Sequence, residues 1–144
     1  GSKIERVVRA SSKPVMIASR EVVEPKAIVF AYDGSPAAER ALERLANSPL
    51  FTDLTVHIVM ADTDNEAHRR ALARAGGQLE GSRQVTTTLR RGKPETIIAD
   101  IVAQTPGSML MMGAYGHSPL RTLIVGSTTT AMIRTVHVPV LLVR

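Results

Sequence analysis

The residues best suited to chemistry form a glycine-containing segment near the C-terminus: Gly113 and Gly116, followed by Gly126-Ser127-Thr128. Glycine has no Cβ, so Gly113 can let the backbone approach a ligand closely and Gly116 can turn tightly. Gly126-Ser127 begins a predicted helix, where unpaired N–H groups and the positive end of the helix dipole attract an anion. The hydroxyl groups of Ser127 and Thr128 are additional donors. The segment therefore predicts a phosphate site.

Each of these residues also has a purely structural interpretation. The glycines can serve ordinary loop geometry between a strand and a helix, and Ser127 and Thr128 can cap a helix. A cap and a phosphate contact are compatible, so that alternative does not exclude a site. Asp33 can contact a ligand, or it can only shape its turn through hydrogen bonds to the backbone, as Asp often does before Gly.

The elements that must position these residues alternate between short apolar runs, typical of strands, and patterns typical of helices. Strands are predicted at 26–32, 54–60, 84–89, 108–112 and 138–143, and helices from Ser35-Pro36 to before Pro49 and at 65–79, 94–104 and 127–136. This alternation predicts a parallel, doubly wound α/β sheet. Ligands bind such sheets beyond the carboxyl ends of the strands, where the strand order reverses. Asp33 is therefore expected to face the same crevice as the glycines.

Composition narrows the class of protein. The chain of 144 residues has the size of one domain, and its hydrophobic fraction of 44% includes two Tyr, two Phe and no Trp. With no cysteine, disulfides, thiolate metal sites and a Cys nucleophile are excluded. The net charge of +5 comes from basic residues scattered over helical stretches, which argues against nucleic-acid binding. No apolar run is long enough for a membrane helix, so a soluble, cytoplasmic protein is expected.

An internal similarity suggests a repeat. Gly1 to Ser19 aligns without a gap on Gly126 to Arg144, and Arg9 matches Arg134 while Pro14-Val15 matches Pro139-Val140. We expect residues 1–19 to be a helix and strand resembling the tail of a preceding repeat, residues 20–25 a linker, and residues 26–144 the domain itself. Alternatively, any short helix before a Pro-Val strand looks similar, and Gly1-Ser2 is a cleavage scar.

The spacing G-x-x-G, nine residues, then G-S resembles the nucleotide-binding signature of ATP-binding universal stress proteins. Gly113, Gly116 and Gly126-Ser127 match it, and the similarity covers about residues 26–144, including the Tyr-Asp-Gly-Ser turn and the closing Val-Pro-Val-Leu-Leu-Val strand. The resemblance implies a five-stranded parallel sheet in the order 3-2-1-4-5, Rossmann-like, with an extra N-terminal helix and edge strand. Together with the repeat, it implies the C-terminal domain of a tandem protein.

The resemblance also implies a ligand and its contacts. ATP would be bound, bringing Mg²⁺ with it, and no metal ligand is assigned to the protein itself. Asp33 and the backbone at Ala31 and Met60 would hold the adenosine part. Residues Gly113 to His117 and Gly126 to Thr128 would hold the phosphates. The full set of nucleotide-binding residues is Ala31, Tyr32, Asp33, Met60, Gly113, Gly116, His117, Gly126, Ser127 and Thr128.

Three functions remain open at this point. The first is a regulatory ATP-binding module in a stress response, with little or no catalysis. The second is a slow ATPase or phosphotransferase, for which His117 is the nearby candidate base. The third is a non-binding structural half of a tandem protein. Because the family's final strand commonly mediates edge-to-edge dimers, Pro14 to Ser19 is predicted to pair with Pro139 to Val143, as self-association within a chain or between chains.

Overall fold

The computed structural model describes residues 15–17, 24–81, 83–113 and 138–143. Most of the strands and helices found there agree with the sequence prediction to within one or two residues. The predicted N-terminal helix and the predicted helix at 127–136 lie outside the described residues. The elements are β1 (Val15–Ile17), β2 (Ala27–Ala31), α2 (Pro36–Asn47), β3 (Thr55–Ala61), α3 (Glu66–Leu79), β4 (Val85–Arg90), α4 (Pro94–Ala103), β5 (Ser108–Gly113) and β6 (Val140–Val143).

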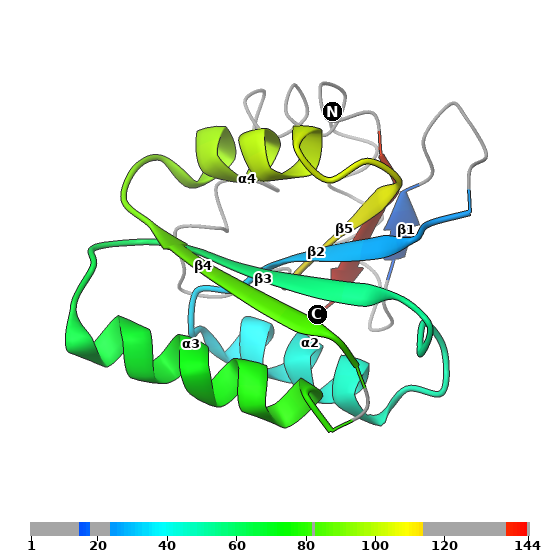
Figure 1. Ribbon diagram of the computed structural model, residues 1–144, viewed down its shortest axis with the longest axis horizontal. Coiled ribbons are helices and arrows are strands. Elements are labelled where there is room, and N and C mark those ends of the chain that lie inside the picture. The colour runs from blue at the N-terminus through cyan, green and yellow to red at the C-terminus, as the bar shows by residue number, and fades with distance from the viewer. Residues whose placement is uncertain (1–14, 18–23, 82, 114–137, 144) are drawn as a thin grey trace.

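The strands form a single sheet in the order β1-β6-β5-β2-β3-β4 (Figure 1). All neighbours from β6 to β4 are parallel, and counting them from β2 in chain order gives 3-2-1-4-5, which confirms the predicted sheet. β1 adds a sixth strand, antiparallel to β6, with Val15 opposite Leu142 and Ile17 opposite Val140. The predicted extra edge strand is therefore present, and the two predicted segments are paired.

Helices cover both faces of the sheet: α2 and α3 lie on one side and α4 on the other (Figure 1). Each side has its own hydrophobic cluster, one under α4 and one under α2 and α3. The central strand β2 is buried along its whole length, as is β5. A strand that is covered on both faces has a nearly continuous run of apolar residues in its sequence. These two strands can be predicted from the sequence for that reason.

Local signals explain where the helices begin. The Ser35 side chain accepts a hydrogen bond from the backbone N–H of Ala38 at 3.1 Å, and Pro36 occupies the first turn of α2. Asn65 caps α3 in the same way. The glycine pair in α3 does not interrupt that helix: Gly76 is buried, and a Cβ there would lie 3.4 Å from Thr87 of β4. Its small size thus suits the packing of α3 on the sheet.

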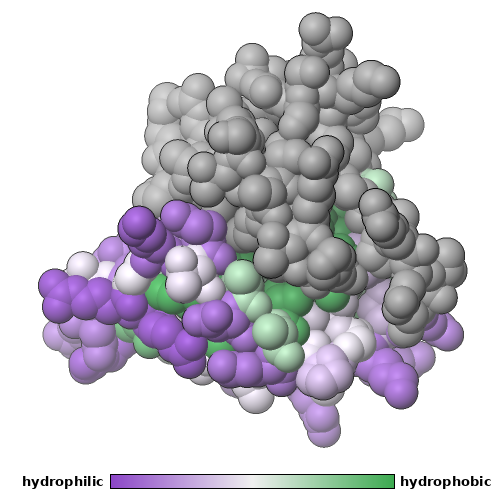
Figure 2. Space-filling model, turned by 90° about the horizontal axis from the view of Figure 1, so that it is seen from above, coloured by the Kyte–Doolittle hydropathy of each residue, from purple (hydrophilic) through white to green (hydrophobic). Residues whose placement is uncertain are grey.

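On the face seen in Figure 2, the described surface is largely hydrophilic. Figure 2 shows the molecule from above, relative to the view of Figure 1. Hydrophilic residues dominate its coloured part, and hydrophobic atoms are visible in a narrow band. Among the described residues, Met16 and Leu50 are the large hydrophobic side chains that are exposed, by 46% and 62%. Met16 lies on β1, and Leu50 lies in the loop between α2 and β3.

The loop between α2 and β3 is held by a buried arginine. The guanidinium of Arg83 donates to the carbonyl oxygens of Leu50 at 3.0 Å and of Ser48 and Phe51 at 3.4 Å. Arg83 is only 7% exposed, and Phe51 adopts a left-handed backbone conformation with φ of 62°. Such a conformation costs free energy for a residue with a Cβ, so surrounding contacts must enforce it. Arg83 supplies three of those contacts.

Replacing Arg83 by Met is expected to lower the free energy of unfolding by about 2 kcal/mol, because three carbonyl groups lose their charged donor while the apolar stem is kept. Urea denaturation measures the change. Arg91→Met is the matched control, since Arg91 is exposed. Equal stability of the two variants would show that the loop is held without the Arg83 guanidinium.

Candidate functional site

The carboxyl ends of β2 and β5 lie side by side, with Ala31 opposite Met112. From β2 the chain proceeds to β3 and β4 on one side, whereas β5 and β6 lie on the other. The strand order therefore reverses between β2 and β5, which is the place where open α/β sheets bind ligands. The backbone N–H of Tyr32 donates to the carbonyl oxygen of Val59 at 2.9 Å, so β2 and β3 stay paired up to this edge.

Asp33 follows β2 at this edge and has two different oxygen environments. Its Oδ1 accepts a hydrogen bond from the backbone N–H of Ser35 at 3.0 Å. Gly34, between them, has a positive φ of 77°, which glycine adopts without strain. The alternative that Asp33 shapes its own turn is therefore correct for one carboxylate oxygen.

The other oxygen, Asp33 Oδ2, is buried and has no hydrogen-bond partner among the described residues. A buried acceptor without a donor costs about 1–3 kcal/mol, and more when it is charged. One further side-chain oxygen in the described ranges shares this state, the hydroxyl of Ser108, at the opposite end of β5. Asp33 thus presents an unused acceptor at the strand-order reversal, where it can accept a hydrogen bond from a hydroxyl or amino group of a ligand.

Gly113 ends β5 close to Asp33's turn, but its neighbour is the protein itself. A Cβ at this position would lie 2.7 Å from the carbonyl carbon of Ala37 and 2.8 Å from the backbone nitrogen of Ala38. Real Cβ atoms do not approach backbone atoms so closely, so the first turn of α2 fills the space that a side chain would take. This glycine therefore has a packing role between β5 and α2, and the contact of its backbone with a phosphate stays a prediction.

The side chain of Tyr32, which is also predicted to contact the nucleotide, packs against α2 and α3. The ring is buried in the cluster under α2 and α3, and its hydroxyl bonds the carboxylate of Glu39 on α2. Arg74 on α3 donates to the Tyr32 hydroxyl at 3.0 Å and to Glu39 Oε1 at 2.6 Å. Successive residues of a strand face opposite sides, so the Tyr32 side chain lies on the α2 and α3 side of the sheet and that of Ala31 on the α4 side. A contact between the Tyr32 backbone and a nucleotide stays a prediction.

This cluster of Tyr32, Glu39 and Arg74 shifts the pKa of its members. Burial, followed by the hydrogen bond to Glu39, raises the pKa of Tyr32 well above its usual range. Partial burial raises the pKa of Glu39, but the hydrogen bonds from Arg74 and Tyr32 outweigh burial, and the net pKa is lowered. Glu39 therefore stays ionised, and the cluster joins β2 to both helices on this face. Sequence reasoning missed Glu39 and Arg74 because they are remote from each other in the chain.

Replacing Glu39 by Gln is expected to lower the free energy of unfolding by about 1 kcal/mol at neutral pH. Because the pKa of Glu39 is lowered in the folded state, the stability it contributes is present above its unfolded value of 4.5 and is lost as the pH falls through the folded value. The difference between Glu39→Gln and the unaltered chain should therefore shrink below about pH 4.5. Urea denaturation across this range, with exposed Glu43→Gln as control, measures it; a constant difference would contradict the ionic role.

The other predicted residues divide into two groups. Met60 lies on β3 with its side chain buried under α2 and α3, so only its backbone is available at the crevice. Gly116, His117, Gly126, Ser127 and Thr128 lie outside the described residues. Within the described ranges no group of His, Asp or Glu side chains has the geometry of a metal site, and no helix is long and apolar enough to span a membrane.

Comparison with known proteins shows which family has this architecture. The sequence profile of the universal stress protein family matches residues 59–144. A universal stress protein from Synechocystis sp. is 33% identical over 153 aligned positions, which cover 100% of this chain and 51% of that protein. The crystal structure of a universal stress protein from Archaeoglobus fulgidus superimposes with a TM-score of 0.74 at 29% identity, covering 96% of this chain and 52% of the other. The chain spans about half the length of both.

A second structure from Archaeoglobus fulgidus, a universal stress protein in complex with dAMP, shares the fold with a TM-score of 0.62 at 19% identity. It covers 85% of this chain and 100% of its own. The parallel sheet and its covering helices are thus common to relatives of single-domain length and to relatives about twice as long.

Proposed function

This chain belongs to the universal stress protein family, and from that premise we propose that it is a regulatory module that binds ATP with Mg²⁺ and has little or no catalytic activity. The nucleotide binds at the carboxyl ends of β2 and β5. Binding biases the association of the module with itself or with other proteins in a stress response.

The observation that carries this proposal is the Oδ2 of Asp33 at the strand-order reversal, which is buried and has no hydrogen-bond partner within the described ranges. A carboxylate in this position suits the hydroxyl groups of a ribose or the amino group of an adenine, because both are hydrogen-bond donors. Its partner oxygen is fixed by the N–H of Ser35, so the carboxylate is already oriented before a ligand arrives. The relative described in complex with dAMP supports an adenine nucleotide as the ligand class.

The phosphates extend from Asp33 toward the segment that follows β5. Gly116 and His117, and then Gly126, Ser127 and Thr128, are proposed to hold them, with Mg²⁺ carried by the nucleotide. The backbone at Ala31 and Met60 lies at the same edge of the sheet and is proposed to contact the adenosine part.

We further propose that the chain is the C-terminal domain of a cytoplasmic tandem protein. The relatives of about twice its length support this arrangement. In it, residues 1–19 are the tail of the preceding repeat, residues 20–25 the linker and residues 26–144 the domain. The antiparallel pairing of β1 with β6 supports a second role, strand pairing between the two repeats at this edge, and exchange of β1 between chains would make the same pairing a self-association.

Calorimetric titration with ATP and Mg²⁺ tests the proposal, with released phosphate assayed in the same samples. Binding that is lost in a Gly126→Ala, Ser127→Ala double variant, with negligible hydrolysis, supports the regulatory module. Sustained turnover would make the chain a slow ATPase or phosphotransferase. Absence of binding by the unaltered, folded chain would leave the pairing role alone.

A further inference from the structure

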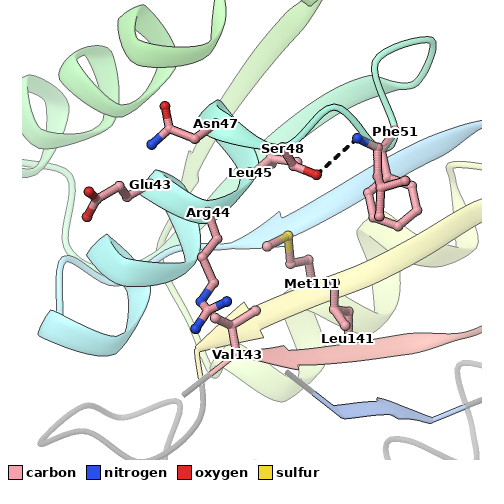
Figure 3. Close-up of a pocket in the computed structure, with 10 residues that line it drawn as sticks. Glu43, Arg44, Leu45, Asn47, Ser48, Phe51, Met111, Leu141 and Val143 are labelled. Carbon is pink, nitrogen blue, oxygen red and sulfur yellow. Dashed lines mark hydrogen bonds between the residues drawn. The ribbon is translucent and has the colours of Figure 1, made fainter. Parts of the chain in front are cut away.

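A pocket lies away from the strand-order reversal and shares no residue with the candidate nucleotide site. It has a volume of about 560 Å³, and it is bounded by the C-terminal half of α2, the loop that follows it, and the strands β5 and β6 (Figure 3). Met111, Leu141 and Val143 form its floor, and Leu45 and Phe51 contribute to its walls. Small-molecule sites of roughly 300–1,000 Å³ with mostly apolar linings have this character.

In the part of the chain that the structure describes, the helical layer on this side ends before the sheet does. Phe30, Met111, Leu141 and Met16 are directly opposite one another on β2, β5, β6 and β1, so their side chains share one face of the sheet. Phe30 and Met111 are buried under α2, Leu141 is partly buried, and Met16 is 46% exposed. Among the described helices, none covers this face beyond α2. An apolar floor therefore continues past the edge of the helix.

The wall of this pocket is fixed in advance. Phe51 lines it with a left-handed backbone, and the buried Arg83 guanidinium holds the carbonyl groups of Phe51 and of Leu50 beside it. A wall that is already ordered loses little conformational entropy when a ligand binds. Phe51, the residue with the left-handed backbone, thus shapes the concave wall of the pocket.

The charged side chains at the rim of the pocket, Arg44 and Glu43, bear on the charge of a ligand. Arg44 lines the pocket, and in Figure 3 its guanidinium extends toward Val143, whereas the Glu43 carboxylate points away from Met111 and Leu141. Arg44 has no ion-pair or hydrogen-bond partner in the part of the chain that the structure describes. The forked guanidinium matches a carboxylate in geometry. Because Arg44 is the cationic side chain among the lining residues that the structure describes, a head group carrying one negative charge matches it better than a phosphate with two.

We propose that this pocket binds a free medium-chain aliphatic carboxylate. Its hydrocarbon chain lies over Met111, Leu141 and Val143, and its carboxylate pairs with Arg44. Leu45 and Phe51 cover the sides of the chain, and the volume limits its length. Because the pocket and the nucleotide site share no residue, this assignment does not depend on ATP binding.

Decanoate is the probe, titrated into the full chain carrying ¹³C-labelled methionine methyl groups and followed by two-dimensional NMR. The Met111 methyl signal is expected to shift with saturation, while that of Met112, in the hydrophobic cluster under α4 on the opposite face of the sheet, stays in place. Arg44→Gln should weaken binding about tenfold or more, because a charge-assisted pair is lost. Arg40→Gln is the matched control: Arg40 is exposed on the same helix and does not line the pocket. Decanol, which lacks the charge, should bind as weakly to the unaltered chain as decanoate binds to Arg44→Gln.

Three results would overturn the assignment. The Met111 signal could remain unchanged up to the solubility limit of decanoate. Arg44→Gln and Arg40→Gln could weaken binding equally, which would indicate general attraction to a basic surface. Finally, Met16 and Met111 could shift with protein concentration alone, together with a change of sedimentation coefficient, which would make this face a contact between copies of the chain.

Discussion

Asp33→Asn is expected to weaken ATP binding by between about tenfold and a hundredfold, because a charged acceptor in a buried site is replaced by a donor. The substitution is nearly isosteric. The amide oxygen of Asn can still accept the hydrogen bond from Ser35 that shapes the turn. Its amide nitrogen then takes the place of Oδ2 and cannot accept a hydrogen bond from a ribose hydroxyl or an adenine amino group. Isothermal titration calorimetry with ATP and Mg²⁺ measures the loss.

Two further measurements distinguish an effect of the substitution on the turn from an effect on ligand binding. Thermal unfolding of Asp33→Asn should stay close to that of the unaltered chain, since the cap of α2 and the Ser35 contact are kept. Asp53→Asn, at an exposed position, should bind ATP normally. If Asp33→Asn bound ATP as tightly as the unaltered chain, Asp33 would be a turn residue only, and the nucleotide proposal would lose the observation on which it rests.

Gly113→Ala is expected to destabilise the fold by about 1–3 kcal/mol or more, as inserting a methyl group into closely packed surroundings does. The added Cβ would meet backbone atoms of Ala37 and Ala38 at 2.7 and 2.8 Å. Backbone atoms cannot swing aside as a side chain can, so α2 would have to move away from β5. Urea denaturation at neutral pH measures the change in the free energy of unfolding.

Gly77→Ala is the matched control for this prediction. A Cβ at Gly77 in α3 would have no heavy atom within 4 Å, and the position is exposed. This substitution should stabilise the chain by about 0.5–1 kcal/mol, because alanine loses less backbone entropy in a helix than glycine does. A Gly113→Ala chain as stable as Gly77→Ala would show that α2 can shift without cost.

The sheet could be predicted because its strands carry their signal locally. β2 and β5 are apolar at every position that lies between two helical layers, and Ser35-Pro36 and Asn65 mark helix starts by local hydrogen bonding. Strand order and the crevice at Asp33 then followed from general rules of parallel sheets and from the family resemblance. The strand-order reversal and the position of Asp33 are therefore properties that a sequence can specify within a few residues.

The contacts that sequence reasoning missed join residues from distant elements. No sequence pattern around Glu39 indicates its contact with Arg74. In the same way, no pattern around Arg83 indicates its hydrogen bonds to the carbonyl groups of the loop after α2. The signature groups Gly113 with its neighbours in the chain, whereas the atoms nearest to a Cβ at this position belong to the start of α2, far back in the chain. Tyr32 is different, because strand alternation predicts which side of the sheet its side chain faces. Ala31, the residue before it, belongs to the cluster on the opposite side.

The pairing of β1 with β6 also has a consequence for the order of folding. Val15 and Leu142 come from the two ends of the described chain, whereas the parallel pairs β2 with β3 and β3 with β4 join strands separated by a single helix. Closing a longer loop costs more entropy, and β1 contributes only a three-residue strand in return. This ladder should therefore form after the parallel sheet and open before it, so that its amides exchange with solvent faster than those of β2.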